Sequence, residues 1–107
     1  EIGGGTQISS GAEPSPMRTP NAEDDDFDRG YEHWLMTEAK ARNPDIALLG
    51  LVYAWPGWIS PNGTSPFMNV ESEQRAAKYV SKWVSGVKTF HNLTIDWVGL
   101  WNEREYT

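Results

Sequence analysis

The 107-residue sequence predicts an α/β fold in which parallel strands alternate with helices. Residues 46–55 and 95–101 are nearly continuous apolar runs, which is typical of strands covered on both faces of a parallel sheet. Residues 27–43 and 70–90 instead carry apolar side chains at helical spacing. With "EIGGG" at the start interpreted as the end of an earlier strand, the order is β-α-β-α-β, which indicates crossover helices between parallel strands.

Each predicted helix has one apolar face. Asp24 to Asp26 are expected to cap the first helix, and Asn43-Pro44 ends it. Its buried face is expected to consist of Phe27, Tyr31, Trp34, Leu35 and Ala39. The second helix is expected to bury Ala76, Val80, Trp83, Val87 and Phe90 and to leave Lys78, Lys82 and Lys88 in solvent.

The predicted loops differ in length at the two ends of the strands. Residues 43–45 and 91–94 make short helix-to-strand loops, whereas residues 6–26 and 55–69 make long strand-to-helix loops. Long loops at the carboxyl ends of parallel strands build active sites in α/β folds. A barrel and a doubly wound sheet both fit this order, but no nucleotide-binding glycine motif is present. In a (β/α)8 barrel of ~250 residues, about two and a half repeats would be present here.

Composition narrows the class of protein. The net charge of -6 argues against a nucleic-acid partner, and no apolar run has the length of a membrane-spanning helix. The chain starts at Glu1 without a leader, so we expect an internal piece of a larger protein, with no second domain in residues 1–107. The acidic run "EDDDFD" at residues 23–28 is interpreted as a solvated loop and helix start, with a cation site as the alternative. Cysteine is absent.

Two tripeptides match the N-glycosylation acceptor pattern. They are "NGT" at Asn62 and "NLT" at Asn92, and both lie in predicted loops. A protein of the secretory pathway is therefore favoured. His33 and His91 are isolated in the sequence, and His91 is interpreted as a helix C-terminal cap. No metal or cofactor is expected.

The most informative stretch is "IDWVGLWNER", where an apolar strand ends in Asn102 and Glu103. Glycoside hydrolysis needs a carboxylic acid that protonates the leaving oxygen, and apolar neighbours raise the pKa of such a group. Neighbouring strand residues point to opposite faces, so a bulge is needed for both side chains to reach one pocket. The alternative is an exposed strand end at which Glu103 pairs with Arg104.

Aromatic residues follow the preceding strand in "YAWPGW", residues 53–58. Trp55 and Trp58 flank a rigid Pro-Gly turn and are candidates for a platform on which sugar faces stack. The alternative is that these loop aromatics simply cover the rim of the barrel.

The segments "EIGGGTQISSGAEPS", "RGYEHWLMTEAKARNP", "WPGW" and "IDWVGLWNEREY" together make the chain similar to glycoside hydrolase family 59 along almost its whole length. The resemblance implies a catalytic (β/α)8 TIM barrel with further β-domains. It implies a lysosomal retaining β-galactosidase that hydrolyses galactosylceramide to galactose and ceramide and works with a saposin that presents the lipid. It implies no cofactor.

The resemblance also implies roles for individual residues. Glu103 matches the family's proton donor and general base, and Asn102 matches a galactose-binding asparagine. Ser9 stands where the family has a substrate-binding threonine, and Tyr53 where it has a tryptophan that contacts substrate. Pro16 replaces a histidine of the family pattern. The nucleophile belongs to a later strand, so residues 1–107 alone are expected to be inactive.

Three rival interpretations are kept. Glu105 is a second candidate acid, although it has no asparagine before it. Another TIM-barrel glycosidase, glucosylceramidase-like or xylanase-like, would carry the same Asn-Glu strand ending. A non-catalytic carbohydrate- or lipid-binding relative would keep the barrel and lack the second carboxylate.

Overall fold

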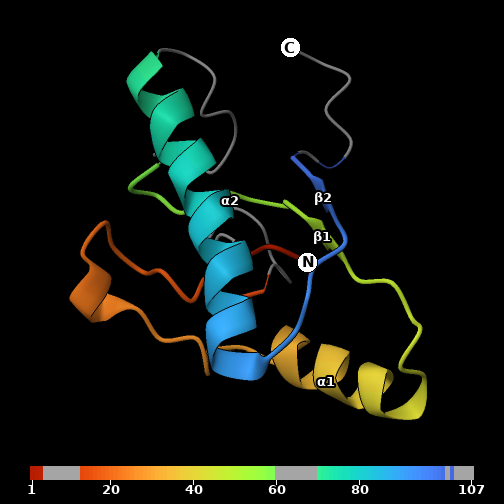
Figure 1. Ribbon diagram of the computed structural model, residues 1–107. Coiled ribbons are helices and arrows are strands. Elements are labelled where there is room, and N and C mark those ends of the chain that lie inside the picture. The colour runs from red at the N-terminus through yellow and green to blue at the C-terminus, as the bar shows by residue number, and fades with distance from the viewer. Residues whose placement is uncertain (4–12, 60–69, 101, 103–107) are drawn as a thin grey trace.

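The computed structural model describes residues 1–3, 13–59, 70–100 and 102. Within these ranges the chain forms the helices α1 (Glu32–Arg42) and α2 (Val70–His91) and the strands β1 (Leu49–Leu51) and β2 (Trp97–Gly99). A short 3-10 helix, η1 (Ala22–Asp24), precedes α1. Helices and strands alternate along the chain, as Figure 1 shows, and the predicted α/β class is confirmed.

Parallel pairing organises the strands as expected. β1 pairs with β2 in a register that sets Leu49 beside Trp97 and Leu51 beside Gly99. Ile2 lies along the other edge of β1, where its N–H donates to the Leu51 carbonyl at 2.6 Å. The prediction that "EIGGG" ends an earlier strand is thus confirmed at Ile2, whose pairing with Val52 is also parallel. Three parallel segments lie side by side in chain order, which is how consecutive βαβ units are arranged.

The described chain covers only one face of these strands. Leu48, Gly50 and Val52 are buried, and a Cβ at Gly50 would lie 2.8 Å from the Trp83 ring of α2. The alternate residues are open, with exposed fractions of 58% for Leu49 and 63% for Trp97. The expected covering of both faces is therefore wrong for this part of the chain. Side chains alternate along a strand, and only one of the two faces meets α2.

Helix α2 supplies most of the core. Ala76, Val80, Trp83 and Val87 are buried, as the helical spacing predicts. Phe90 is an exception, because it is 66% exposed and only stacks its ring on that of Phe27 at 5.1 Å. Lys78 and Lys88 are exposed as expected. Lys82 is half-buried, and its ammonium lies 2.5 Å from the Asp25 carboxylate.

Helix α1 begins five residues later than the sequence predicts, at Glu32 rather than Phe27. Gly30 has a φ of +90°, a left-handed conformation that glycine adopts readily. A right-handed helix cannot continue through a residue in this conformation, so α1 starts after Gly30. The first amides of the helix are then satisfied by the buried Glu13 carboxylate, which accepts from the N–H of Tyr31 at 2.6 Å and of Glu32 at 3.1 Å. The predicted capping by Asp24 to Asp26 is therefore wrong.

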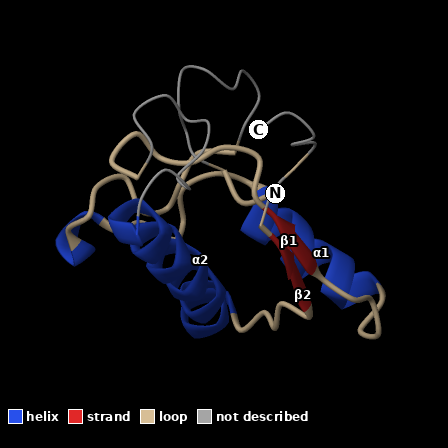
Figure 2. Cartoon of the chain, turned by 90° about the horizontal axis from the view of Figure 1, so that it is seen from above, coloured by secondary structure: helices blue, strands red, loops and turns tan. Residues whose placement is uncertain are grey.

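Of the predicted apolar face, Phe27 is buried as expected but lies before α1, whereas the positions on α1 itself are not buried by the described chain. Trp34 is 61% exposed and Leu35 is 49% exposed, and no residue of α1 is classed as buried. Seen from above in Figure 2, α2 lies beside the strand pair and α1 passes beneath it. The apolar side chains of α1 thus face outward from the described residues, apart from Met36, which packs against the core.

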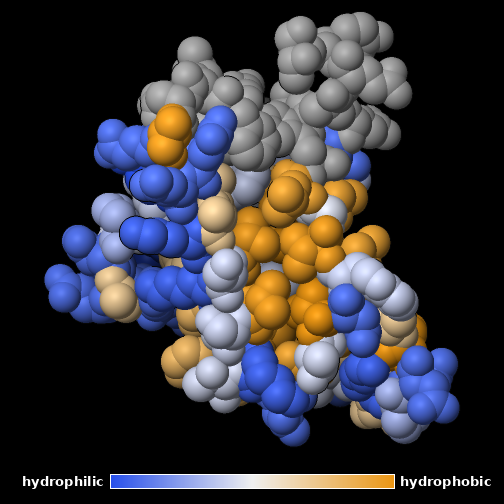
Figure 3. Space-filling view, turned by 45° about the horizontal axis from the view of Figure 1, so that its top comes forward, coloured by the Kyte–Doolittle hydropathy of each residue, from blue (hydrophilic) through white to orange (hydrophobic). Residues whose placement is uncertain are grey.

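An apolar surface lies open between α2 and the strands, and Figure 3 shows it at the centre of the molecule. Part of it is a groove of ≈ 650 Å³ whose apolar lining is Val80, Val84 and Val98. In the described ranges, neither helix has the length and hydropathy needed to cross a membrane.

Candidate active site at the carboxyl ends of the strands

Tyr53 and Asn102 lie next to each other along the backbone ladder, just after the ends of β1 and β2. The Val52 N–H donates to the Gly99 carbonyl at 3.0 Å, and the Asn102 N–H donates to the Val52 carbonyl at 3.1 Å. These two hydrogen bonds continue the ladder beyond Leu51 and Gly99. Asn102 is therefore held by backbone contact directly beside the residue that precedes Tyr53.

The ladder gains one residue on the side of β2 before it reaches Asn102. Trp97 and Asn102 donate to Leu48 and Val52, so the donors are five residues apart and the acceptors only four. In a regular parallel ladder the two separations are equal. One extra residue on one strand is the signature of a β-bulge. This shift of one residue gives Asn102 the ladder place beside Tyr53. The bulge expected to let Asn102 and Glu103 share one pocket stays a prediction, because Glu103 lies outside the described residues.

The two side chains suit polar recognition at an open face. Tyr53 is 45% exposed and follows Leu49 and Leu51 on the face that α2 does not cover. Asn102 is half-buried. A phenol and a carboxamide each donate and accept hydrogen bonds, which is what a ligand rich in hydroxyl groups requires.

Trp55 and Trp58 are packed into the protein and do not form an open platform for a sugar face. Trp55 is only 2% exposed, and its ring meets that of Tyr79 edge-on, with 6.0 Å between the ring centroids. Trp58 is half-buried, with its Nε1–H donating to the Met17 carbonyl at 3.2 Å. Both rings therefore belong to the packing beneath the strand ends, which fits the alternative that they cover the rim.

Tyr79 is a residue of this region that sequence reasoning missed. Its hydroxyl donates to the Gly3 carbonyl at 2.7 Å and lies 2.8 Å from the Ser15 Oγ. Burial raises the pKa of Tyr79, so the phenol stays neutral. The spacing held a signal, because Tyr79 follows the predicted core residue Ala76 by one helical turn. Tyr79 thus joins α2 to Gly3 before the first long loop and to Ser15 within it.

Several predicted site residues lie outside the described ranges. They are Ser9, Asn62 and Glu103. Asn92 is described, and it is exposed with a φ of +53°, in the left-handed conformation that often ends a helix. Its side-chain oxygen accepts from the Lys88 ammonium at 3.1 Å. The acceptor side chain of that sequon is thus at the surface.

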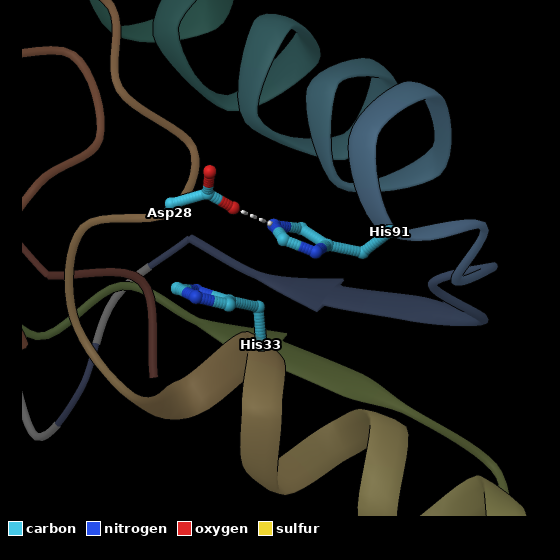
Figure 4. A group of neighbouring side chains, drawn as sticks. All are labelled: Asp28, His33 and His91. Atoms are coloured by element: carbon cyan, nitrogen blue, oxygen red, sulfur yellow. Dashed lines mark ion pairs between the residues drawn. The ribbon is translucent and has the colours of Figure 1, made fainter.

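One group in the described residues has the side chains to hold a metal ion. Asp28, His33 and His91 each offer a ligand atom, and these atoms lie within 4.8 Å of one another. Figure 4 shows that they come from the loop before α1, from α1 and from the end of α2. This group lies between the start of α1 and the end of α2, and it contains none of the predicted site residues.

These features describe an α/β domain that gathers polar side chains at the carboxyl ends of parallel strands, the usual place of an active site in this class. Comparison with known proteins identifies the family. A profile for "Glycosyl hydrolase family 59" matches residues 1–107, and the chain belongs to this family. The resemblance noted in the sequence is confirmed.

The relatives agree with this assignment. Galactocerebrosidases of Homo sapiens and Salmo salar are each 48% identical over 106 residues, covering 99% of this chain. A putative galactocerebrosidase of Caenorhabditis elegans is 33% identical over 108 residues, covering all of this chain. The chain spans about 15% of the length of these relatives.

Proposed function

We propose that this chain is part of the catalytic domain of a retaining β-galactosidase that hydrolyses galactosylceramide to galactose and ceramide. The observation that supports this proposal is the position of Asn102, whose backbone hydrogen bond to Val52 holds it beside Tyr53 at the strand ends, because Glu103 is the next residue. The names of the relatives support the choice of substrate.

In this proposal Glu103 is the acid and base of the reaction. It protonates the glycosidic oxygen as a second carboxylate attacks the anomeric carbon, and it then takes a proton from the water that releases galactose. The second carboxylate comes from a later strand, ~5 to 5.5 Å from Glu103, as retention requires. Asn102, Tyr53 and Ser9 bind sugar hydroxyl groups.

We propose a (β/α)8 barrel as the complete fold of the domain. Its support is the parallel, chain-order arrangement of Ile2, β1 and β2 and the apolar surfaces beside them. In a barrel the face with Leu49 and Trp97 points inward, where layers of branched and aromatic side chains fill the interior. Later repeats would also fill the groove along Val84 and Val98.

The wider setting is proposed from the family and the sequons. The protein acts in sphingolipid degradation in the lysosome, on a glycolipid presented by a saposin-type activator. The exposed position of Asn92 is compatible with glycosylation during passage through the secretory pathway. Asn62 is the second proposed acceptor.

The role of Glu103 is tested by E103Q in the full-length protein. With galactosylceramide, whose leaving group is a poor one, the first chemical step should slow by roughly 10²–10⁴-fold because a general acid is lost. With nitrophenyl β-galactoside, whose leaving group needs little protonation, that step should slow far less. Single-turnover kinetics on both substrates separate this step from the second.

The matched control is E105Q, which removes the rival carboxylate two residues away. It should leave both substrates nearly unaffected. Equal slowing of both substrates by E103Q, or the substrate-dependent pattern in E105Q instead, would reject the assignment. Faster turnover of glucosyl- than of galactosylceramide by the unaltered protein would favour a glucosylceramidase-like enzyme. The absence of a carboxylate on the later strand of the full-length sequence would favour a non-catalytic binding protein.

A further inference from the structure

Two histidines and an aspartate come together outside the set of predicted site residues. The rings of His33 and His91 stack with 4.4 Å between centroids and 13° between planes. The Oδ1 atom of Asp28 lies 3.8 Å from Nε2 of His91. The three residues come from separate segments of the chain, and Figure 4 shows them facing one another between α1 and the last turn of α2.

A backbone carbonyl oxygen also lies next to His91. Nε2 of His91 also lies 2.6 Å from the carbonyl oxygen of Phe27, the residue before Asp28. Two imidazoles and one carboxylate make a donor set that suits zinc and neighbouring divalent ions, which prefer imidazole far more than Mg²⁺ does. His91 ends α2, where helix carbonyls favour positive charge.

The three ligand atoms lie within 4.8 Å of one another, and a side-chain rotation is needed to bring them around one ion. At ligand distances of ~2.0 to 2.1 Å, ligand atoms around zinc are ~3.3 Å apart, somewhat closer than Asp28 and His91 here. The lone pairs of stacked rings do not converge, because each lies in its own ring plane. His33 must therefore turn out of the stack. Its side chain is half-buried and Asp28 is 91% exposed, so both have room to move.

We propose that Asp28, His33 and His91 form a binding site for a divalent transition-metal ion of the zinc type. The ion fastens the first turn of α1 to the end of α2 and to the loop before α1. The ion would thereby stabilise the position of α1, which buries none of its own residues against the described chain. The site is structural, since it contains none of the residues proposed to bind or cleave the substrate.

Zinc binding by the full-length protein tests this proposal. Metal-free protein is titrated with Zn²⁺ in competition with a chromophoric chelator, and thermal unfolding is followed with and without Zn²⁺. H33Q and H91Q should each remove one equivalent of binding or weaken it at least ~10-fold, since changes even outside the ligand shell cost that much. D28N should weaken the same equivalent. The Zn²⁺-dependent rise in Tm should shrink in all three variants.

The control is D45N, which removes an exposed carboxylate outside the cluster. It should bind zinc like the unaltered protein, and Mg²⁺ should not raise Tm. Since a histidine variant can fold poorly, the unaltered protein is also treated with diethyl pyrocarbonate, and Zn²⁺ should protect His33 and His91 from modification. Unchanged zinc stoichiometry in H33Q and H91Q, or no protection of either histidine, would overturn the proposal.

Discussion

Single buried polar groups join distant parts of this chain. The Glu13 carboxylate supplies the acceptor for the first amides of α1, and the Tyr79 hydroxyl connects α2 to Gly3 and Ser15. Both contacts span long separations in sequence, and both groups are almost fully buried. A buried polar group that loses its partner is costly, so these residues hold the loops near the candidate site in place.

The prediction at this scale concerns Tyr79. Y79F should lower the free energy of unfolding by about 1–2 kcal/mol at neutral pH, because it leaves the Gly3 carbonyl and the Ser15 hydroxyl without this partner. Burial raises the pKa of Tyr79, so its stabilising effect is complete below pH ~10 and is lost as pH rises above that value toward the raised pKa. Y79F should remove this alkaline loss.

Thermal unfolding of the intact protein between pH 7 and 11 measures both effects. Y53F is the matched control, because the side chain of Tyr53 is 45% exposed. It should change neither Tm at neutral pH nor the alkaline slope. A Y79F protein as stable as the unaltered one at pH 7, with the same alkaline loss, would contradict the prediction.

At the scale of elements, the contact between α2 and the segment before α1 depends on a glycine. A Cβ at Gly86 would overlap the ring of Phe27, which is buried and stacked on Phe90. Glycine inside a helix costs ~1 kcal/mol relative to alanine, so its presence here indicates a packing requirement. The absence of a side chain at Gly86 thus lets α2 pack closely against Phe27, in the loop that leads into α1.

G86A is therefore expected to destabilise the protein, although alanine is the better helix former. Overpacking of this kind costs typically ~1–3 kcal/mol, more than the gain in helix propensity. G57A is the control, since no atom lies within 4 Å of a Cβ built at Gly57. Chemical denaturation should show a loss for G86A and almost none for G57A. A G86A protein more stable than the unaltered one would show that the Phe27 ring moves aside freely.

For the whole molecule, the described residues leave large apolar areas uncovered. Leu49 and Trp97 on the strands, Trp34 and Leu35 on α1, and the groove along Val84 all face away from the core. Surfaces of this kind mark contact with further protein. The relatives are several times longer than this chain, which covers about 15% of them.

Residues 1–107 expressed alone should accordingly show no galactosidase turnover, because the second carboxylate is expected after Thr107. They should also bind the dye ANS strongly through the open apolar surfaces, unlike the full-length protein. A fluorogenic galactoside assay and dye fluorescence measure these outcomes. Turnover by the purified 107-residue chain above that of its E103Q variant would refute the proposal that the second catalytic carboxylate lies outside residues 1–107.

The sequence alone determined the features that depend on local periodicity. The α/β order, the buried stripe of α2 and the place of Asn102 at a strand end follow from apolar spacing, because residues close in sequence share a face of a helix or strand. The resemblance in motifs likewise led to the family, which the comparison confirmed.

Only the tertiary structure decided the features that depend on partners far away in the chain. Helix α1 starts at Glu32 because a carboxylate at position 13 reaches its first amides, and the sequence around residue 27 contains no sign of that contact. Trp55 is buried because Tyr79 packs against it, and His33 meets His91 only because the two helix ends come together. Periodicity identifies which face of an element is apolar, but what covers that face depends on the rest of the fold.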